Sequence, residues 1–405
     1  MIAHDRVLDD EQRSALEAPL ERSLAIVGGA GSGKSTVLAA RVERALQRGG
    51  EVVVLAGSER FGALAFRLLA ALGPPVRELG EYEAFARFER AVARLCARDV
   101  PELAHLEDLE VAGLGRAERF ARAAFRLIGK LRAALVSPEE FRGAGLRGAT
   151  RFAGAPPNLA DVVLLDRLDR KEHAALRVDS SELARQHERE ATLVELLAHL
   201  YRELLAATVE VGALTPADAV CEAGRCLAQA APEQRASLAP RALFVDDAQD
   251  CTPAQARLLA ALLGPDLGGL TVAGDPQQAT LGFSHGARAH ELLGRAALTV
   301  ELQGRYRGDA TLVRAAQIAL GAPVPNVRSA GPRSVEFVRG EDVAGEAREL
   351  AARFAERIRA GTPPRELALV LRSLRSAEPY IAALLARRVP VDCAGAGDPL
   401  AFAST

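Results

Sequence analysis

The chain has 405 residues, 51 of them basic and 53 acidic, a formal net charge of −2 and a hydrophobic fraction of 49%. With so little net charge, any nucleic-acid binding must come from local basic surfaces. No apolar run approaches the roughly 18 residues of a membrane-spanning helix, and the N-terminus lacks a signal-peptide pattern. We therefore expect a cytoplasmic protein without membrane contact. The five cysteines are scattered, and Cys221 and Cys226 have no second pair, which favours buried thiols over a zinc site.

The first apolar run, at 24–27, leads directly into Gly-Gly-Ala-Gly-Ser-Gly-Lys-Ser-Thr at 28–36, and an amphipathic stretch follows. This is the phosphate-loop pattern in the strand–loop–helix context that it requires. The glycines allow backbone N–H groups to surround phosphate oxygens at the positive end of the following helix. Lys34 is expected to reach the β- and γ-phosphates, and Ser35 to bind Mg²⁺. The nucleotide-binding residues predicted here are Gly28, Gly29, Ala30, Gly31, Ser32, Gly33, Lys34, Ser35 and Thr36.

Lysine usage supports a functional role for Lys34. Only three of the 51 basic residues are lysines, the others being Lys130 and Lys171. A lysine retained in this loop is hard to explain by a chance Gly-rich turn. The chain is therefore expected to bind ATP.

Further β-like apolar runs occur at 52–56, 243–246, 270–274 and 299–302, with helical patterns such as 37–48 and 254–263 between them. Strands that alternate with helices predict an α/β fold with a parallel sheet. The stretch from about 100 to 235 is mostly helical in period, with a loop-like break at 148–158. We interpret it as an insertion: residues 1–105 and 236–297 form a discontinuous first domain, and residues 106–235 form the helical insertion.

A second α/β pattern begins near 299. It comprises a strand at 334–339, a helix at 342–360, a strand at 367–372 and a helix at 377–388. Residues 298–405 are therefore expected to form part of a second domain.

Three polar blocks follow the later strands, and one precedes the phosphate loop. They are VDDAQD at 245–250, GDPQQ at 274–278, RYR at 305–307 and LDDEQ at 8–12. An acid at the carboxyl end of a buried strand, in a chain with a phosphate loop, is expected to hold Mg²⁺. Asp246 is in that position.

Together with the phosphate loop and in this order, these blocks resemble the UvrD/Rep (PcrA-like) branch of the superfamily 1 DNA helicases. Only the phosphate loop is specific by itself, but the set is specific, and the resemblance extends over essentially the whole chain. It implies two RecA-like domains, with ATP and Mg²⁺ as cofactors. It also implies ATP hydrolysis coupled to 3′–5′ movement on single-stranded or tailed duplex DNA.

The resemblance also implies individual roles. Gln12 is similar to the glutamine that reads the adenine edge, for which an amide offers both a donor and an acceptor. Tyr306 is similar to the tyrosine that stacks on adenine. Arg307 resembles the arginine that reaches the γ-phosphate from the second RecA-like domain. Gln278 resembles the glutamine that senses the γ-phosphate and couples it to DNA.

One departure concerns hydrolysis. The family places Glu after the Mg²⁺-binding aspartate, where it orients and deprotonates the attacking water, whereas this chain has Asp247. A displacement on the order of 1 Å can cost about a hundredfold in rate. With Lys34, Asp247, Gln278 and Arg307 as the catalytic set, we expect slow hydrolysis.

The DNA-binding blocks depart further from the pattern. Leu55-Ala56-Gly57-Ser58 replaces the block that supplies an aromatic platform, and Glu81-Tyr82-Glu83 replaces a Thr-x-His block, so its two acids are expected to repel phosphate. Of a third block only the aromatic Phe283 is kept. Because base stacking is worth about 1–3 kcal/mol per base, weak single-strand binding is expected.

A basic helix face offers other DNA contacts. Arg116, Arg119, Arg122, Arg126 and Lys130 recur at three- and four-residue spacing. The opposite face is apolar, with Phe120, Ala124, Leu127, Ile128 and Leu131. Either a solvated surface or a DNA contact explains this pattern. The candidate DNA-binding residues are Phe283, Arg372, Arg119, Arg122 and Arg126.

The family pattern continues past the position of Thr405 with a second inserted domain and two more motifs, one of which supplies a second γ-phosphate arginine. Two interpretations stay open. The chain is the ATP-binding part of a DNA helicase or translocase, or it is a degenerate, non-translocating ATP-binding partner or regulatory subunit of a DNA repair complex. In the second case, another protein chain would complete the motor. An unrelated P-loop kinase is disfavoured because it explains neither GDPQQ nor RYR.

Overall fold

The computed structural model describes residues 8–56, 58–73, 76–96, 117–152, 180–279, 291–304, 310–321, 336, 338, 340–371 and 376–392. The chain divides into two compact units. The first consists of Met1–Gly308 with Pro325–Ser329, and the second of Asp309–Val324 with Ala330–Thr405. Within the described ranges, no helix is long and apolar enough to cross a membrane.

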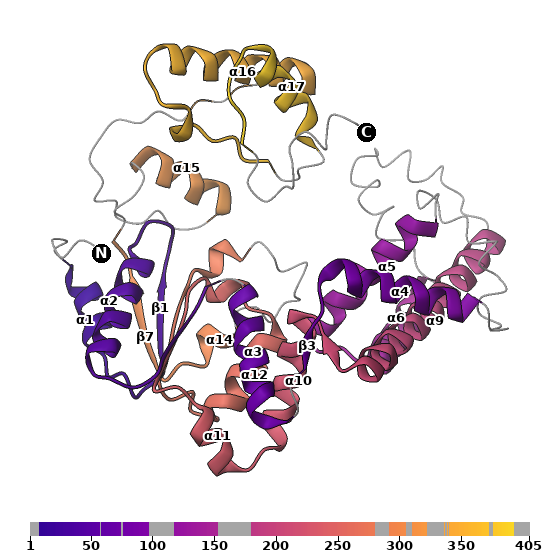
Figure 1. Cartoon of the computed structure of the whole chain (residues 1–405). Helices are drawn as coiled ribbons and strands as arrows, with labels where there is room; N and C mark the ends of the chain where they lie inside the picture. The colour runs from indigo at the N-terminus through magenta and orange to yellow at the C-terminus, as the bar shows by residue number, and fades with distance from the viewer. Residues whose placement is uncertain are drawn as a thin grey trace. The chain divides into compact units, whose positions relative to one another are not determined.

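The first unit is built on a five-stranded sheet in the order β2-β5-β6-β1-β7, in which β7 lies beside β1 (Figure 1). Its paired strands all run parallel. The strands are β1 (Leu24–Gly28), β2 (Val52–Leu55), β5 (Ala242–Val245), β6 (Leu270–Gly274) and β7 (Leu298–Leu302). The predicted α/β class with a parallel sheet is confirmed. The sequence pattern places the strand near 299 at the start of a second domain. In the structure this strand, β7, pairs with β1 of the first sheet, with Leu302 opposite Gly28.

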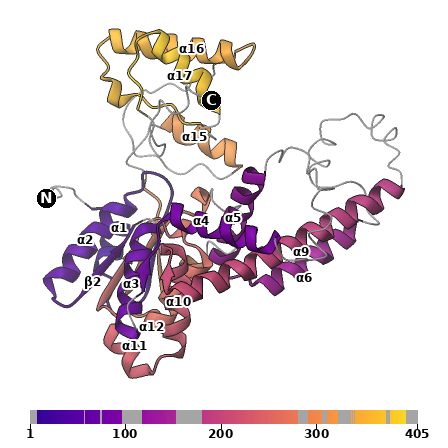
Figure 2. The same cartoon turned by 45° about the vertical axis from the view of Figure 1, so that its right-hand side comes forward.

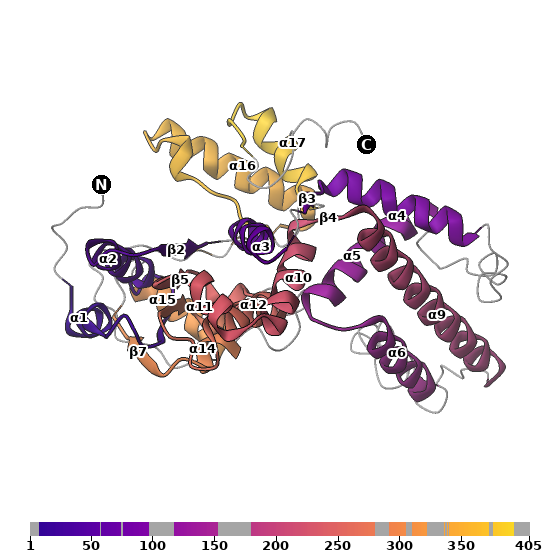
Figure 3. The same ribbon diagram turned by 60° about the horizontal axis from the view of Figure 1, so that its bottom comes forward.

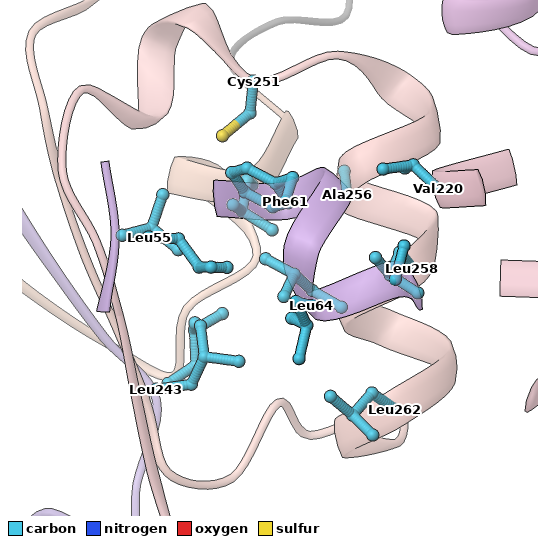
Figure 4. Packing of buried hydrophobic residues seen from close by; sticks show 14 of the residues in the cluster. Leu55, Phe61, Leu64, Val220, Leu243, Cys251, Ala256, Leu258 and Leu262 are labelled. Carbon is cyan, nitrogen blue, oxygen red and sulfur yellow. The ribbon is translucent and has the colours of Figure 1, made fainter. Parts of the chain in front are cut away.

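Helices cover both faces of this sheet, as its continuous apolar strands require. Alternate strand residues point to opposite sides. Leu24, Ile26 and Phe244 pack on the side of α1 (Asp10–Glu17) and α2 (Lys34–Gln47). Ala25 and Leu243 belong to a core that includes residues of α3 (Ser58–Leu72), α10 (Pro216–Gln229) and α12 (Pro253–Leu263). Figure 4 shows this second core, where Phe61 and Leu64 of α3 lie between the sheet and Leu258 of α12.

Four helices form a separate core within the same unit. They are α4 (Glu81–Cys96), α5 (Ala117–Ala133), α6 (Pro138–Phe152) and α9 (Ser180–Val211). Phe88, Ile128 and Leu200 are fully or almost fully buried in this core. Helices α6 and α9 lie side by side along much of their length (Figure 2). The amphipathic pattern predicted for α5 is confirmed, since Ala124 and Ile128 are buried while Arg122 and Arg126 are exposed.

Packing suggests different limits for the helical insertion. Helix α4 shares its core with α5 and α9, whereas α10 packs on α3 and α12 beside the sheet (Figure 3). Helix α11 (Pro232–Leu238) also contacts α12. Between the two groups, the short strand β3 (Arg77–Glu78) pairs in parallel with β4 (Ala213–Leu214). We propose that the insertion runs from about residue 81 to 211 instead of 106 to 235.

The second unit is mostly helical in its described part. It contains α15 (Ala310–Leu320), α16 (Val343–Arg359) and α17 (Glu378–Ala386). Ala351, Leu384 and Val389 form a small core, and the Tyr380 hydroxyl donates to Glu346 Oε1 at 2.8 Å. The helices predicted at 342–360 and 377–388 are confirmed. The predicted strand at 367–372 is wrong for its described residues 367–371, which are not in a strand.

Candidate nucleotide-binding site

The sheet brings three motifs to one edge. The phosphate loop follows β1, Asp246 follows β5, and Asp275 follows β6, which lies between β1 and β5. The register pairs Val27 with Gly274, and Val245 with Val272. Because the strands are parallel, their carboxyl ends meet at the same edge, where ligands of open α/β sheets bind. The fold therefore gathers blocks that are far apart in the sequence.

Glycines shape the phosphate loop for physical reasons. Gly31 and Gly33 have φ values of 76° and 89°, in the left-handed region that favours glycine. Gly33 is the residue from which α2 begins. At Gly28 a Cβ atom would lie 2.6 Å from Ser32 Oγ and 2.8 Å from the Leu302 carbonyl oxygen. A side chain there would therefore disturb both the loop and the pairing with β7.

The loop presents groups that fit a phosphate. Lys34 Nζ donates to the carbonyl oxygens of Gly28 at 2.7 Å and Gly29 at 3.1 Å, so the ammonium lies over the loop. The Ser32 side chain is fully buried, and its hydroxyl has no hydrogen-bond partner. A buried hydroxyl without a partner calls for an explanation, and a phosphate oxygen provides one. Ser35 is exposed in the first turn of α2, at the positive end of the helix.

Gln12 connects α1 to this loop. It forms a capping box with Asp9: its N–H donates to Asp9 Oδ1 at 2.8 Å, and its Oε1 accepts from the Asp9 N–H at 3.3 Å. Its Nε2 donates to the Ser32 carbonyl oxygen at 3.2 Å. The side chain is therefore fixed beside the phosphate loop. A contact between Gln12 and adenine stays a prediction.

Arg41 supports the same region, although the sequence analysis passed over it. Its side chain is fully buried and donates to the carbonyl oxygens of Ala15 at 2.6 Å and Ala18 at 2.9 Å, at the end of α1. Burial lowers the pKa of this guanidinium to about 10, which leaves it charged at neutral pH. A cation is favoured at the negative end of a helix. The available signal was its place in the apolar stripe of α2, between Val37 and Ala45.

The acidic block after β5 forms a hydrogen-bonded cluster. Asp246 is partly buried, and its Oδ1 accepts from the Asp247 N–H at 3.0 Å. Asp247 is exposed and has a left-handed backbone, with φ of 51°. After β6, Gln278 Nε2 donates to Asp275 Oδ2 at 2.8 Å. Asp247 and Gln278 therefore follow adjacent strands, β5 and β6.

The residues present fit Mg²⁺ bound together with a nucleotide. This ion typically binds one or two carboxylates, water and substrate phosphates rather than an all-protein cage. Asp246 and Ser35 are oxygen donors of this kind. The described residues include no group of three or more His, Cys, Asp or Glu side chains placed to hold a metal. Two protein oxygen donors leave coordination positions for water and for phosphate oxygens.

Several predicted site residues lie outside the described part of the chain. They are Tyr306, Arg307, Phe283 and Arg372. Arg119 belongs to α5, but its side chain is not among those described. The roles expected for these residues stay predictions.

The two described DNA candidates differ in their surroundings. The Arg122 guanidinium lies 5.3 Å from the centre of the Phe85 ring, a cation–π distance. Arg126 lines a cavity of about 610 Å³, to which β3, α4, α5, α9, α10 and α12 contribute residues. The cavity also borders Glu78, Glu81 and Arg87. The lining of the cavity therefore carries both signs of charge.

The expected repulsion at Glu81-Tyr82-Glu83 needs correction at Glu83. Its carboxylate pairs with Arg77 at 2.7 Å and with Arg87 at 2.8 Å. Hydrogen bonds from these two arginines lower the pKa of Glu83 to about 2. Two cations thus offset this acid, and Tyr82 beside it is 94% exposed. The spacing of Arg87, four residues after Glu83 on a helix, was the available sequence signal.

Comparisons with known proteins match two regions of the chain. Residues 7–81 match the AAA domain, and residues 163–296 match the UvrD/REP helicase N-terminal domain. Similar curated proteins include the ATP-dependent DNA helicase UvrD2 of Mycobacterium tuberculosis and of Mycobacterium bovis. Each is 35% identical over an alignment of 158 residues that covers 36% of this chain. The aligned stretch spans 22% of the length of these relatives.

Proposed function

This chain carries UvrD-like helicase sequence, and from that premise we propose that it binds ATP with Mg²⁺ and hydrolyses ATP slowly, with a coupling to DNA that is impaired in the isolated chain. The phosphate loop is the observation that carries this proposal. Two of its glycines have a left-handed backbone, its lysine lies over the loop, and its buried Ser32 hydroxyl has no partner, all next to the N-terminus of α2. Asp246 and Gln278 follow neighbouring strands at the same sheet edge.

In this proposal, Lys34 and the first turn of α2 bind the phosphates, while Ser35 and Asp246 supply protein oxygens to the metal. Bound Mg²⁺ neutralises charge on the β- and γ-phosphates. Asp247 orients the attacking water, and Gln278 lies on the γ-phosphate side. Tyr306 and Arg307 would complete the base and γ-phosphate contacts. Catalysis of this kind depends on positioning and electrostatic stabilisation, so the shorter Asp247 limits the rate.

Single-stranded or tailed duplex DNA is the proposed partner, with 3′–5′ polarity following from the resemblance. Arg122 and Arg126 give α5 an exposed basic face, whose phosphate contacts would be sensitive to salt. The alternative is an ATP-binding regulatory subunit that does not move along DNA and works with a second protein chain. Asp247, in the place of the family glutamate, favours this alternative. The DNA assay described below separates the two.

The nucleotide site is tested by titrating a fluorescent ATP analogue in the presence of Mg²⁺. Lys34→Ala removes the ammonium over the loop, so it is expected to weaken binding at least about tenfold, the effect of losing roughly 1.4 kcal/mol. Lys130→Ala is the matched control, because Lys130 is an exposed lysine on α5. Wild-type affinity in Lys34→Ala would contradict the assignment of the site.

A further inference from the structure

Gln249 lies between the two blocks that follow β5 and β6. It belongs to the short 3₁₀ helix η2 (Ala248–Asp250), and its side chain is 3% exposed. Its Nε2 donates to Asp247 Oδ1 at 3.3 Å, and its Oε1 accepts from the Asp275 N–H at 3.0 Å. One buried amide therefore uses both of its ends on residues that follow two different strands.

The contact to β6 depends on a glycine. A Cβ atom at Gly274 would lie 2.8 Å from Gln249 Oε1 and 3.3 Å from the Gln249 main-chain nitrogen. Gly274 thus leaves room for the amide to reach the Asp275 N–H. Such a close fit between two motifs restricts the conformations that the Gln249 side chain can adopt.

The chain of hydrogen bonds continues beyond Asp275. The Asp275 carboxylate accepts from the Gln277 N–H at 3.0 Å and from Gln278 Nε2 at 2.8 Å. Asp247 and Gln278 are thereby connected through Gln249 and Asp275, and we call this chain of hydrogen bonds the relay. Gln249 and Asp275 in the middle of this chain are buried, whereas Asp247 and Gln278 at its two ends are exposed. Buried polar groups that all have partners are restricted to one arrangement.

We propose that Gln249 is a positioning residue that holds the Asp247 carboxylate and the Asp275–Gln278 pair in one arrangement. The inference rests on the proposed function, because Asp247 and Gln278 are the groups assigned there to water and to the γ-phosphate. Asp247 is one methylene shorter than the family glutamate. In this proposal the hydrogen bond from the Gln249 amide fixes the position of its carboxylate. Gln249 transmits a change at either residue to the other, and it does so without contacting the nucleotide itself.

The first test needs no nucleotide. In Gln249→Met, a side chain of similar size without polar groups, the Asp275 N–H loses its acceptor, so we expect its amide hydrogen to exchange at least about tenfold faster. Gln249→Glu keeps an acceptor for this N–H but loses the donor to Asp247, so protection at Asp275 should stay near the wild-type level. Gln255→Met is the matched control, because Gln255 is also a buried glutamine whose Oε1 accepts from a backbone N–H, that of Thr252. Unchanged exchange at Asp275 in Gln249→Met would overturn the proposal.

The second test measures the relation to Asp247. Gln249→Glu places two carboxylates together, while Asp247→Asn in the same protein restores a donor–acceptor pair with its direction reversed. A double-mutant cycle by thermal denaturation should show favourable coupling between these two changes. Additive effects on stability would contradict the relay.

The third test links the relay to the nucleotide. Gln249→Met is expected to lower kcat about tenfold while the KM for ATP changes less than twofold, because a positioning residue acts on the reacting group rather than on binding. The preference for an ATP analogue over ADP should also fall. If the wild-type protein binds no nucleotide, the proposed function fails but the exchange result at Asp275 still stands. If the wild-type protein binds ATP, and Gln249→Met matches Gln255→Met in kcat, in KM and in the preference for the ATP analogue, the proposed role of the relay is contradicted.

Discussion

Arg132 and Asp218 form an ion pair, with 2.5 Å between Arg132 Nη1 and Asp218 Oδ1, and their side chains are 12% and 10% exposed. Arg132 lies in the last turn of α5, a helix that contributes to the helical core. Asp218 lies in the first turn of α10, which packs against the sheet domain. This pair therefore joins the helical insertion to the nucleotide-binding part of the same unit.

Removal of one member of this pair should destabilise the first unit. Asp218→Asn leaves the Arg132 cation buried without a carboxylate, a change that typically costs about 3–5 kcal/mol. We expect the free energy of unfolding to fall by this order in urea denaturation followed by circular dichroism. Glu195→Gln is the control, because Glu195 pairs with the more exposed Arg142, 46% of whose side chain is accessible. Equal effects of the two substitutions would show that burial does not set the contribution of the Arg132 pair.

Local patterns predicted the parts of the fold that local physics determines. The strand that ends at Gly28, the helix that begins at Lys34 and the apolar face of α5 all follow from periodicity and glycine spacing. Two of the glycines expected to shape the phosphate loop, Gly31 and Gly33, have a left-handed backbone. The sheet edge that gathers the motifs follows from strands joined by helical crossovers, which make a sheet parallel.

Features that depend on distant partners were not predictable in this way. The pairing of Arg77–Glu78 with Ala213–Leu214 joins two short segments with little β pattern of their own. Arg41 carries a charge in an apolar stripe, and its partners are the carbonyl oxygens at the end of α1 and the hydroxyl of Thr271 in β6. In the sequence Gln249 is one of several polar residues of VDDAQD, and its role becomes visible only from its hydrogen bond with the Asp275 N–H. In each case the partner comes from another part of the sequence.

Lengthening the side chain at 247 should increase ATP hydrolysis. Asp247→Glu adds the methylene that the family residue has, and recovery of a displacement on the order of 1 Å is worth up to about a hundredfold in rate. We expect steady-state turnover to rise about tenfold or more, with little change in the affinity for ATP. Wild-type turnover should stay well below about 10 per second, a typical enzyme rate. A fall in turnover on this substitution would show that Asp247 is already placed for its role.

Binding to single-stranded DNA should be weak and should depend on the basic face of α5. Arg122→Ala together with Arg126→Ala removes two exposed cations. Each phosphate contact to a single strand contributes about 0.7 to the slope of log K against log salt concentration. The double variant is therefore expected to lower this slope by about 0.7 for each arginine that contacts the strand. Arg225→Ala with Arg257→Ala removes the same charge from exposed positions on α10 and α12 and serves as the control.

The rate of ATP hydrolysis with and without oligo-dT decides between the two proposed functions. Because the residues at 55–58 lack an aromatic platform and Asp247 is short, DNA should stimulate ATP hydrolysis by this chain little, even at low salt. A strand-displacement assay on a 3′-tailed duplex should show no unwinding by the chain alone. This result favours an ATP-binding partner that acts with another protein. Strong stimulation together with unwinding would favour the helicase itself, and loss of both in the α5 double variant would then place the strand on that helix.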